Sequence, residues 1–525
     1  MLRLIVICFT LFFFAPRLKG AEPSAPKLIL YIIIDELNNE QLLLLQPKFT
    51  KDGFNRISSQ GMRFMSAYSA NLSGYPGTRL TSFYTGTTPS VHGIVGEQWY
   101  DKKINHYVEA ATPSFSNISQ TLHYNQAPSI SDHLKSFYGP DVRSAAITIQ
   151  APWMLHTVGY APDYFFNFNT VHGTFVDQIA PAAYETQWLQ RFNENLLRSQ
   201  LRQRQWGPLY DITSYTEYQY LAKNDQKNFR SFLYNMNIRE GAPFQQFAAS
   251  PYANTLVRDL AVSFIAGTDF AKNGTPDVLS LVFTARPFSS NGSILPAEKE
   301  DMLLRLDRDI ASLITFLDNE LGKDKYLIVF TAAASSAPDH STSGKRGVTT
   351  GVVEFNKISA LLNFYLMAIH GQGKWVLGMH DNTVYLNHQL IKEKSLAIDE
   401  MQQLAARFLM DVAGIDRALP TYHMVFDITT ETVLSNNIYP SRSGDIILSL
   451  QSGWQSAVTR AGTRQTGHSG NTPVPLTIRG WQVTPGAWFE PLEHHYITPL
   501  LLKQLGIIHP SILQSPLVPV FKPRP

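Results

Sequence analysis

The amino-acid sequence predicts an α/β fold with a mainly parallel central sheet and helices on both faces. Four short segments of aliphatic and β-branched residues are typical of strands buried on both sides: 28–34, 145–149, 278–283 and 327–330. Segments with apolar residues at helical spacing lie between them. Strands that alternate with helices favour parallel pairing, because a crossover helix returns the chain to the same end of the sheet.

Two weaker strand candidates follow later in the chain, at 446–450 and 475–479. The helical candidates cover 256–265, 297–321, 399–412 and 499–505. In the longest of them the leucines share one face. Three charged residues of that helix are expected to face water: Asp307, Arg308 and Asp309.

Residues 1–21 are predicted to be a secretory signal peptide. Arg3 precedes an apolar run, 4–14, that is too short to cross the ~30 Å hydrocarbon core of a membrane as a helix. Arg17 and Lys19 flank this run, which leaves an uncleaved anchor as the alternative. The signal predicts export to the periplasm or the medium, and no later segment is apolar enough to span a membrane.

The predicted α/β domain covers 22–510. Cap insertions are expected at about 152–251 and 338–440, and a proline-rich tail at 511–525. The first insertion is aromatic and interrupted by prolines, whereas the second has a short α/β pattern of its own. Both are expected to cover the carboxyl-terminal edge of the sheet.

The composition argues against several functions. A formal net charge of +2 with 16% charged residues disfavours a nucleic-acid-binding protein. Cys8 is the single cysteine and lies inside the predicted signal, so the mature chain has no disulfide and no cysteine nucleophile. These features favour a protein of the bacterial cell envelope that is stabilised by its apolar core.

Six short motifs resemble those of a known enzyme family. They lie at 34–37, 83–94, 99–101, 250–256, 304–310 and 441–446. With these motifs in this order, from about residue 27 to 510, the chain resembles the alkaline phosphatase superfamily. The similarity is to the branch of secreted bacterial alkaline phosphatases and nucleotide pyrophosphatase/phosphodiesterase-like proteins.

The resemblance implies a particular catalytic site. In that family two zinc ions, held by three aspartates and three histidines, bridge the phosphoryl group, and a Thr or Ser at a helix N-terminus attacks phosphorus. Paired dications stabilise the attacking and leaving oxygens and lower the pKa of the nucleophile. The helix N-terminus adds backbone N–H donors for the phosphate.

Position by position, this chain departs from the family pattern. Asp35 corresponds to the first metal ligand, as a remnant of the site. The nucleophile position falls on Pro76, which has no hydroxyl, with Ser73 and Thr78 as possible substitutes. At three further ligand positions the chain has Ala333, Ala334 and Arg464. His468, which lies close to the last of these positions, is a weak candidate ligand.

Basic and neutral residues stand where the family has ligands and phosphate-holding groups. The segment 284–292 has no carboxylate and no imidazole, and carries Arg286. We hypothesise that Arg286 and Arg464 approach the former zinc positions and bind an anion, since guanidinium groups pair well with oxyanions. Two surface arginines are the alternative. Phosphate-holding positions are also changed, to Glu97 or Gln98, Gln150 and Pro152.

The expected function is that of a pseudoenzyme: an exported superfamily member that has lost metal-dependent phosphatase chemistry and takes no cofactor. Its partner would be an unknown envelope protein or an anionic ligand. The alternative is an active phosphomonoesterase or phosphodiesterase with a remodelled two-zinc site, and a structural envelope subunit is a third possibility. Ligands of the remodelled site would come from Asp35, Asp339, His340 and His468. His92 is expected to have a structural, hydrogen-bonding role. His494 and His495 could bind a metal as a pair, but neighbouring side chains on a regular element point apart.

Overall fold

The computed structural model describes residues 25–112, 118–180, 186–196, 205–222, 231–236, 244–286, 295–333, 351–426, 432–451, 453–460, 463–467, 472–514, 516 and 518–522. The predicted signal, 1–21, lies outside these ranges. In the described residues no helix is long and apolar enough to cross a membrane.

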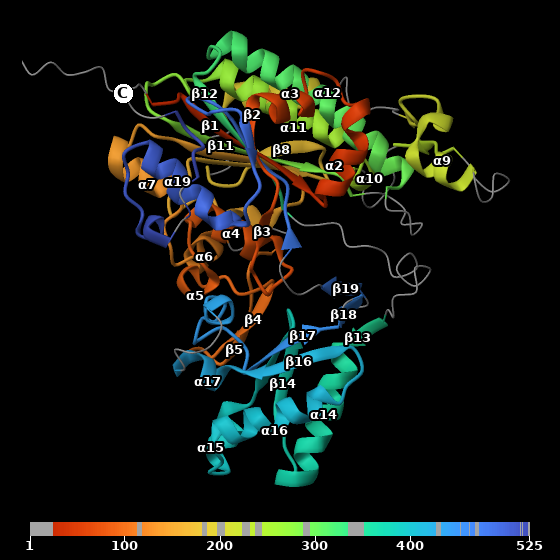
Figure 1. Ribbon diagram of the computed structural model, residues 1–525, viewed down its shortest axis with the longest axis vertical. Helices are drawn as coiled ribbons and strands as arrows, with labels where there is room; N and C mark the ends of the chain where they lie inside the picture. The colour runs from red at the N-terminus through yellow and green to blue at the C-terminus, as the bar shows by residue number, and fades with distance from the viewer. Residues whose placement is uncertain are drawn as a thin grey trace, which may run out of the picture.

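A nine-stranded sheet forms the centre of the larger part of the molecule (Figure 1). Its strands, in spatial order, are β22 (Gly486–Trp488), β2 (Gly61–Phe64), β21 (Leu476–Gly480), β12 (Tyr326–Ala332), β1 (Leu28–Asp35), β11 (Asp277–Thr284), β6 (Ser144–Thr148), β7 (Tyr164–Asn169) and β8 (Thr174–Asp177). The five neighbouring strands from β12 to β7 are parallel. The predicted fold class is therefore confirmed, with antiparallel strands added towards both edges.

The central strand β1 is buried and apolar up to its last residue, Asp35, because both of its faces are covered. Alternate side chains of β1 enter two different cores, with Leu30 and Ile32 on one face and Ile29 and Ile33 on the other. The first core is covered by α2 (Asn39–Leu45), α3 (Phe54–Gln60), α8 (Gln187–Asn195), α11 (Pro251–Gly267) and α12 (Ala297–Glu320). The second is covered by α4 (Pro76–Thr85), α7 (Ile130–Tyr138) and α19 (Ile497–Gln504).

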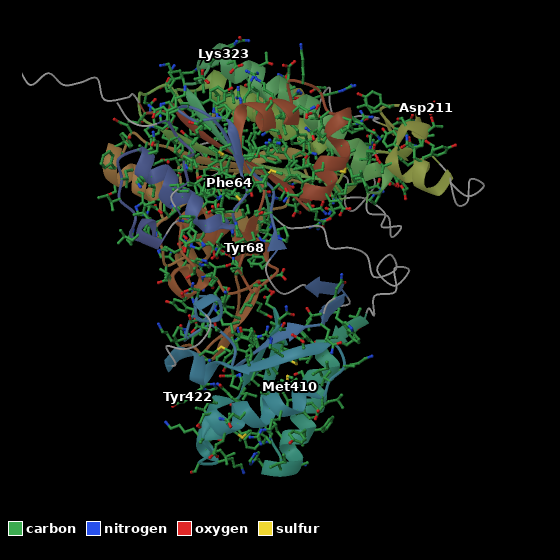
Figure 2. The ribbon with its side chains drawn as sticks, viewed as in Figure 1. Phe64, Tyr68, Asp211, Lys323, Met410 and Tyr422 are labelled. Carbon is green, nitrogen blue, oxygen red and sulfur yellow. The ribbon has the colours of Figure 1, made fainter. Side chains whose placement is uncertain are left out.

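A smaller module with its own core lies at the opposite end of the molecule from α12 (Figure 1). Its antiparallel sheet has the order β14 (Val376–His380), β15 (Thr383–Leu386), β17 (Ile446–Leu450) and β16 (Ile415–Pro420). Its helices are α14 (Phe355–His370), α15 (His388–Glu393) and α16 (Ile398–Met410). Figure 2 shows Met410 and Tyr422 on this module and Lys323 at the far end of the larger part.

Short elements complete the described chain. The small sheets comprise β3 (Ala67–Ser69), β4 (Gln98–Asp101), β5 (His106–Glu109), β9 (Gln205–Trp206), β10 (Tyr234–Asn235), β13 (Gly351–Glu354), β18 (Trp454–Arg460), β19 (Thr463–Gly467), β20 (Thr472–Pro473) and β23 (Leu492–Glu493). The short α-helices are α5 (Pro89–His92), α6 (Ile118–Tyr124), α9 (Thr216–Ala222), α10 (Gln245–Ala248), α17 (Thr421–Phe426) and α18 (Thr432–Ser435). The 3₁₀ helices are η1 (Gln46–Lys48), η2 (Pro152–His156), η5 (Ile212–Ser214), η7 (His494–Tyr496) and η8 (Pro510–Gln514).

Parts of the predicted insertion 152–251 and of the predicted proline-rich tail 511–525 contribute to the main domain. Strands β7 and β8, which belong to the stretch 152–251, extend the central sheet at one edge. In the proline-rich tail the carbonyl of Val520 accepts a hydrogen bond from the Thr484 backbone, and the Val520 side chain is buried. The tail is therefore packed against the main domain at this point.

The larger part and the smaller module meet at a buried arginine. Arg442 donates from Nη1 to the carbonyls of Gly93 and Tyr124, both at 2.7 Å, and lies over the ring of Trp99. Gly93 has φ +76°, and a Cβ there would lie 2.6 Å from Arg442 Nη1. The motifs 83–94, 99–101 and 441–446 therefore meet at this joint, where only a glycine leaves room for the guanidinium.

The expectation that Asp307 and Asp309 face water is wrong. Both are buried, because polar groups of neighbouring helices reach them. Asp307 accepts hydrogen bonds from the backbone of Thr50 and of Phe54, both at 2.7 Å. Asp309 accepts from Thr255 and pairs with Arg258 at 3.0 Å, which fixes α11 against α12. Helical periodicity cannot distinguish a solvated face from one covered by complementary polar groups.

The buried Asp309 is expected to make stability depend on pH. Burial raises the pKa of its carboxyl to about 6, although the Arg258 charge opposes this shift. The folded state then holds a proton more tightly than the unfolded chain between about pH 4 and 6. Stability should therefore fall as pH rises through that window, by roughly 3 kcal/mol in total.

The variant Asp309→Asn, which cannot ionise, tests this expectation. Urea denaturation of both proteins near pH 4 and near pH 7 gives the difference in their free energies of unfolding. The wild type should lose stability relative to the variant at the higher pH. An equal difference at both pH values would show that the pKa of Asp309 is the same in the folded and unfolded chains.

Candidate functional site

Three of the sequence-predicted site residues meet at the carboxyl-terminal ends of β1, β11 and β12. Asp35 is the last residue of β1, and its carbonyl accepts from the Ala285 backbone at 3.2 Å. Ala333, just after β12, donates its N–H to the carbonyl of Ile34 at 3.0 Å. Because the three strands are adjacent and parallel, Asp35, Arg286 and Ala333 lie at one edge of the sheet.

Arg286 joins two carboxylates at this edge. Its Nη2 donates to Asp35 Oδ2 at 3.0 Å, and its Nε pairs with Glu36 Oε1 at 2.8 Å. Lys299, at the start of α12, donates from Nζ to the Glu36 carbonyl. Arg286 is 63% exposed, whereas the Asp35 side chain is 15% exposed. Arg286 thus lies beside Asp35, as the hypothesis of an anion-binding arginine at the former zinc position requires.

Burial and charge compete in this cluster. Burial raises the pKa of Asp35, and the Arg286 charge opposes the rise. Burial likewise lowers the pKa of Lys299 to about 8, although the carboxylates of Glu36 and Asp35 oppose the fall. Each group is therefore disfavoured in its charged form by desolvation and favoured by its oppositely charged neighbours.

The helix α4 begins at Pro76, the position where the resemblance implies a nucleophile. Tyr75 caps this helix, and its ring lies against the first turn: a Cβ at Gly77 would be 2.3 Å from Tyr75 Cε1. The edge of His156 also approaches the Tyr75 ring, with centroids 6.4 Å apart. The helix start is therefore occupied by proline and packed aromatic groups.

The two candidate substitute hydroxyls are buried. Ser73 Oγ accepts a hydrogen bond from the Tyr75 backbone at 3.1 Å, and its residue is 4% exposed. Thr78, in the first turn of α4, is 1% exposed, and its Oγ1 has no hydrogen-bond partner among the described residues. Ser73 is thus committed to the local backbone, while Thr78 retains an unused hydroxyl.

Sequence reasoning missed Arg79, which lies one turn into α4. Its Nη1 donates to the Ala333 carbonyl at 3.4 Å, it interacts electrostatically with Asp35, and it is 5% exposed. Burial lowers its pKa to about 10. The available sequence signal was an arginine at the start of a helix whose other residues are small, apolar or hydroxylated.

Other predicted positions lie elsewhere or outside the described residues. The backbone of Arg464 is on β19, opposite Thr459 of β18, in a sheet separate from β1; its side chain is outside the described part. Ala334, Asp339, His340 and His468 are also outside it. The Glu97 backbone donates to Asp381 at 2.8 Å, and Gln150 donates to Gln245 at 2.9 Å. Gln98 begins β4 and Pro152 begins η2.

The structural role expected of His92 is confirmed. Its ring is buried, with Nε2 2.8 Å from Ser82 Oγ and Nδ1 accepting from the Ile94 backbone. The two neighbouring histidines near the C-terminus have different partners. His494 contacts the Arg79 carbonyl at 2.9 Å, whereas His495 pairs with Glu493 at 3.0 Å.

Comparison with known proteins shows extended similarity. The chain is 23% identical over 511 residues to alkaline phosphatase PafA of Elizabethkingia meningoseptica, covering 93% of this chain and 92% of the relative. It is also 23% identical over 531 residues to alkaline phosphatase PhoV of Synechococcus elongatus, covering 94% and 93%. The crystal structure of wild-type PafA matches the fold with a TM-score of 0.77 at 21% identity, covering 92% of this chain and 96% of that chain.

These relatives contradict one expectation. The prediction that the protein takes no cofactor is wrong, because the relatives that match along more than nine-tenths of the chain are alkaline phosphatases. The resemblance implies two zinc ions for enzymes of this kind. Zinc is therefore the cofactor that relatedness implies for this chain.

The described residues provide few ligands for such a pair of ions. Among them, no group of three or more His, Cys, Asp or Glu side chains is placed to hold a metal ion. Asp35 Oδ1 suits a metal, since it is buried and lacks a hydrogen-bond partner within the described residues. The described residues therefore do not by themselves fit two zinc ions, and the other candidate donors, Asp339, His340 and His468, lie outside them.

A family model also matches most of the chain. The model described as Type I phosphodiesterase / nucleotide pyrophosphatase matches residues 75–473, which include the start of α4, the strands β11 and β12 and the whole smaller module. This match agrees with the similarity to PafA and PhoV. The chain belongs to the Type I phosphodiesterase / nucleotide pyrophosphatase family, within the alkaline phosphatase superfamily.

Proposed function

We propose that this family member has lost the nucleophilic cleavage of phosphate esters and uses the scaffold for binding, as an exported protein of the cell envelope. The observation that carries the proposal is Pro76 at the first position of α4. Proline has no hydroxyl to attack phosphorus and no N–H to donate to a phosphate oxygen. The Tyr75 ring packed on Gly77 covers the same turn.

The state of Asp35 also supports the proposal. In the described residues Oδ2 of this carboxylate pairs with Arg286, which leaves Oδ1 as its free oxygen. A cation held at Oδ1 would be repelled by the neighbouring guanidinium. Cleavage would therefore require a new nucleophile and a metal that tolerates this neighbour.

A turnover assay tests the proposal. The mature chain, supplied with zinc, is expected to hydrolyse neither an aryl phosphate monoester nor an aryl phosphate diester above the rate of the buffer. The zinc content of the same samples is measured. An absence of turnover then refers to protein whose bound metal is known. The physical reason is the missing nucleophile, which does not depend on whether zinc binds.

The variants Ser73→Ala and Thr78→Val provide the matched controls. If the chain lacks turnover, both variants give the same background as the wild type. Zinc-dependent hydrolysis that either substitution abolishes would establish a remodelled active site and overturn the proposal. The unused hydroxyl of Thr78 makes that residue the more informative of the two.

A further inference from the structure

We propose that the outer face of α14 is a docking surface for a second copy of this chain, and that the two α14 helices pair antiparallel in a two-fold dimer. The inference goes beyond the proposed function, because it concerns the smaller module and not the sheet edge at Asp35. It requires neither turnover nor a bound metal ion.

The helix α14 buries one face and exposes the opposite one. Its buried residues share a face that packs into the core of the smaller module: Phe355, Ile358, Leu362 and Leu366. On one flank Tyr365 stacks on Phe408 of α16, with ring centroids 4.8 Å apart. The module therefore covers the inner face and one flank of α14, which lies along the side of the module (Figure 1).

Apolar side chains follow the outer face at helical spacing. Leu361 is 56% exposed and Phe364 is 65% exposed. Ala360 and Ala368, about one turn to either side of Phe364, are exposed as well. The sequence has no Asp, Glu, Lys or Arg from 358 to 373. An uncharged apolar strip with an exposed aromatic ring is typical of a protein–protein interface.

The order of residues along this strip fits a second copy in the opposite orientation. Phe364 lies midway between Ala360 and Ala368, so the strip presents a small, a large and a small residue in either direction. In a two-fold contact each surface meets itself. An antiparallel pair centred on Phe364 places Ala360 of one copy against Ala368 of the other, and these small side chains leave room for the two rings.

Electrostatics at the helix ends favour the same orientation. Lys357 lies on the exposed face in the first turn of α14, where a helix carries partial positive charge and disfavours a cation. In the antiparallel pair, Lys357 of one copy faces Gly371 of the other, at the carbonyl end that carries partial negative charge. The cation is therefore unfavourably placed on its own helix and favourably placed against the second copy.

A lipid surface fits this face less well. Between residues 351 and 450 the sequence has seven basic and ten acidic residues, so this part of the chain carries net negative charge. Helices that lie on anionic membranes are rich in Lys and Arg, which the lipid headgroups attract. The charge therefore favours an uncharged protein surface as the partner, and a second α14 provides one.

Sedimentation velocity of the mature chain at about 1 to 100 μM tests the dimer. We expect a reversible equilibrium between monomer and dimer in the micromolar range, because one helix pair is a small interface. Phe364→Ser should raise the dissociation constant about tenfold or more. Leu43→Ser, at an exposed leucine of α2, should leave it unchanged. If Phe364→Ser does not fold, Leu361→Ser tests the same face.

The variant Lys357→Glu tests the orientation, because the monomer and the dimer respond with opposite signs. A glutamate in the first turn stabilises its own helix but repels the carbonyl end of the second copy. The dimer should therefore weaken several-fold, most strongly at low salt concentration. The thermal stability of the monomer, measured at low protein concentration, should be unchanged or higher.

Cysteine cross-linking tests the register, since the chain from residue 22 onward has no cysteine of its own. A mixture of Ala360→Cys and Ala368→Cys should form disulfide-linked dimers on mild oxidation. Either variant alone should not, because the two copies of one position then lie about 12 Å apart along the helix pair, which is farther than a disulfide spans.

Five outcomes would overturn the inference. The first four are a chain that stays monomeric at every concentration, a dimer that Phe364→Ser leaves unchanged, a dimer that Lys357→Glu strengthens, and cross-linking of Ala360→Cys with itself. The fifth is a monomeric chain that binds vesicles of phosphatidylglycerol and phosphatidylethanolamine and loses this binding in Phe364→Ser. That result would assign the face to a lipid surface.

Discussion

Replacing Asp445 with alanine is expected to lower the free energy of unfolding by about 3–5 kcal/mol. Asp445 is 1% exposed and accepts hydrogen bonds from His388 at 2.6 Å, from the Leu386 backbone at 2.8 Å and from Gln402 at 3.2 Å. Lys102 of the larger part pairs with the same carboxylate at 3.3 Å. The substitution would leave the buried Leu386 N–H and the buried Gln402 amide without this acceptor, and each unmet donor carries its own desolvation cost.

The same residue should make the smaller module sensitive to acid. Burial alone would raise the pKa of Asp445, but the hydrogen bond from His388 and the charge of Lys102 outweigh it, and the pKa is lowered. Asp445 therefore contributes stability above the ordinary pKa of an aspartate, and this contribution is lost as pH falls through the lower, folded pKa. The loss should be absent in the alanine variant.

Chemical denaturation followed by tryptophan fluorescence measures this effect, because the buried Trp375 belongs to the core of the smaller module. Asp416→Ala is the matched control, since Asp416 lies on the same module with a side chain 53% exposed. Unfolding of Asp445→Ala at the denaturant concentration of the control would contradict the expected role of Asp445.

Asp301 is expected to be nearly as important for the larger part. Its carboxylate accepts from the indole of Trp206 and the guanidinium of Arg305 at 2.7 Å, and from the Leu209 backbone and the Tyr215 hydroxyl at 2.6 Å. The side chain of Asp301 is fully buried. Alanine at this position should cost about 3–5 kcal/mol, because four donors would lose one shared acceptor.

The loss should be local before it is global. Asp301 lies on α12, whereas Trp206, Leu209 and Tyr215 lie on a distant stretch of chain that this carboxylate holds in place. Limited proteolysis of Asp301→Ala should therefore cut between about residues 205 and 216 under conditions that leave the wild type intact. Glu320→Ala, at the other end of α12 and 34% exposed, is the control. Equal resistance of both variants would contradict this role.

The secondary structure of the main sheet was predictable because its strands are buried on both faces. The segments 28–34 and 278–283 match β1 and β11 within a residue or two, since continuous apolar runs of this length have few other stable arrangements. Strand 475–479 was also predicted, but not its antiparallel pairing with β12, which depends on a chain connection that local sequence does not describe. The predicted strand 446–450 belongs to the separate sheet of the smaller module.

The motifs that supported the resemblance explain why the family was predictable and the chemistry was not. Arg442 and Asp445 lie in one such motif, and Gly93 and Trp99 in two others, and all are buried at the joint between the two parts. These residues maintain the fold. The resemblance implies that the family performs catalysis at other positions, and it places Pro76 and Ala333 there.

The sequence by itself determined the fold class and the approximate positions of the central strands, because these depend on local periodicity and residue chemistry. Tertiary structure alone decided that Arg286 pairs with Asp35, that Arg79 is buried near Asp35 and that Asp307 and Asp309 are covered. The physical reason is that the free energy of a charge depends on which groups surround it, and those groups come from chain segments hundreds of residues apart.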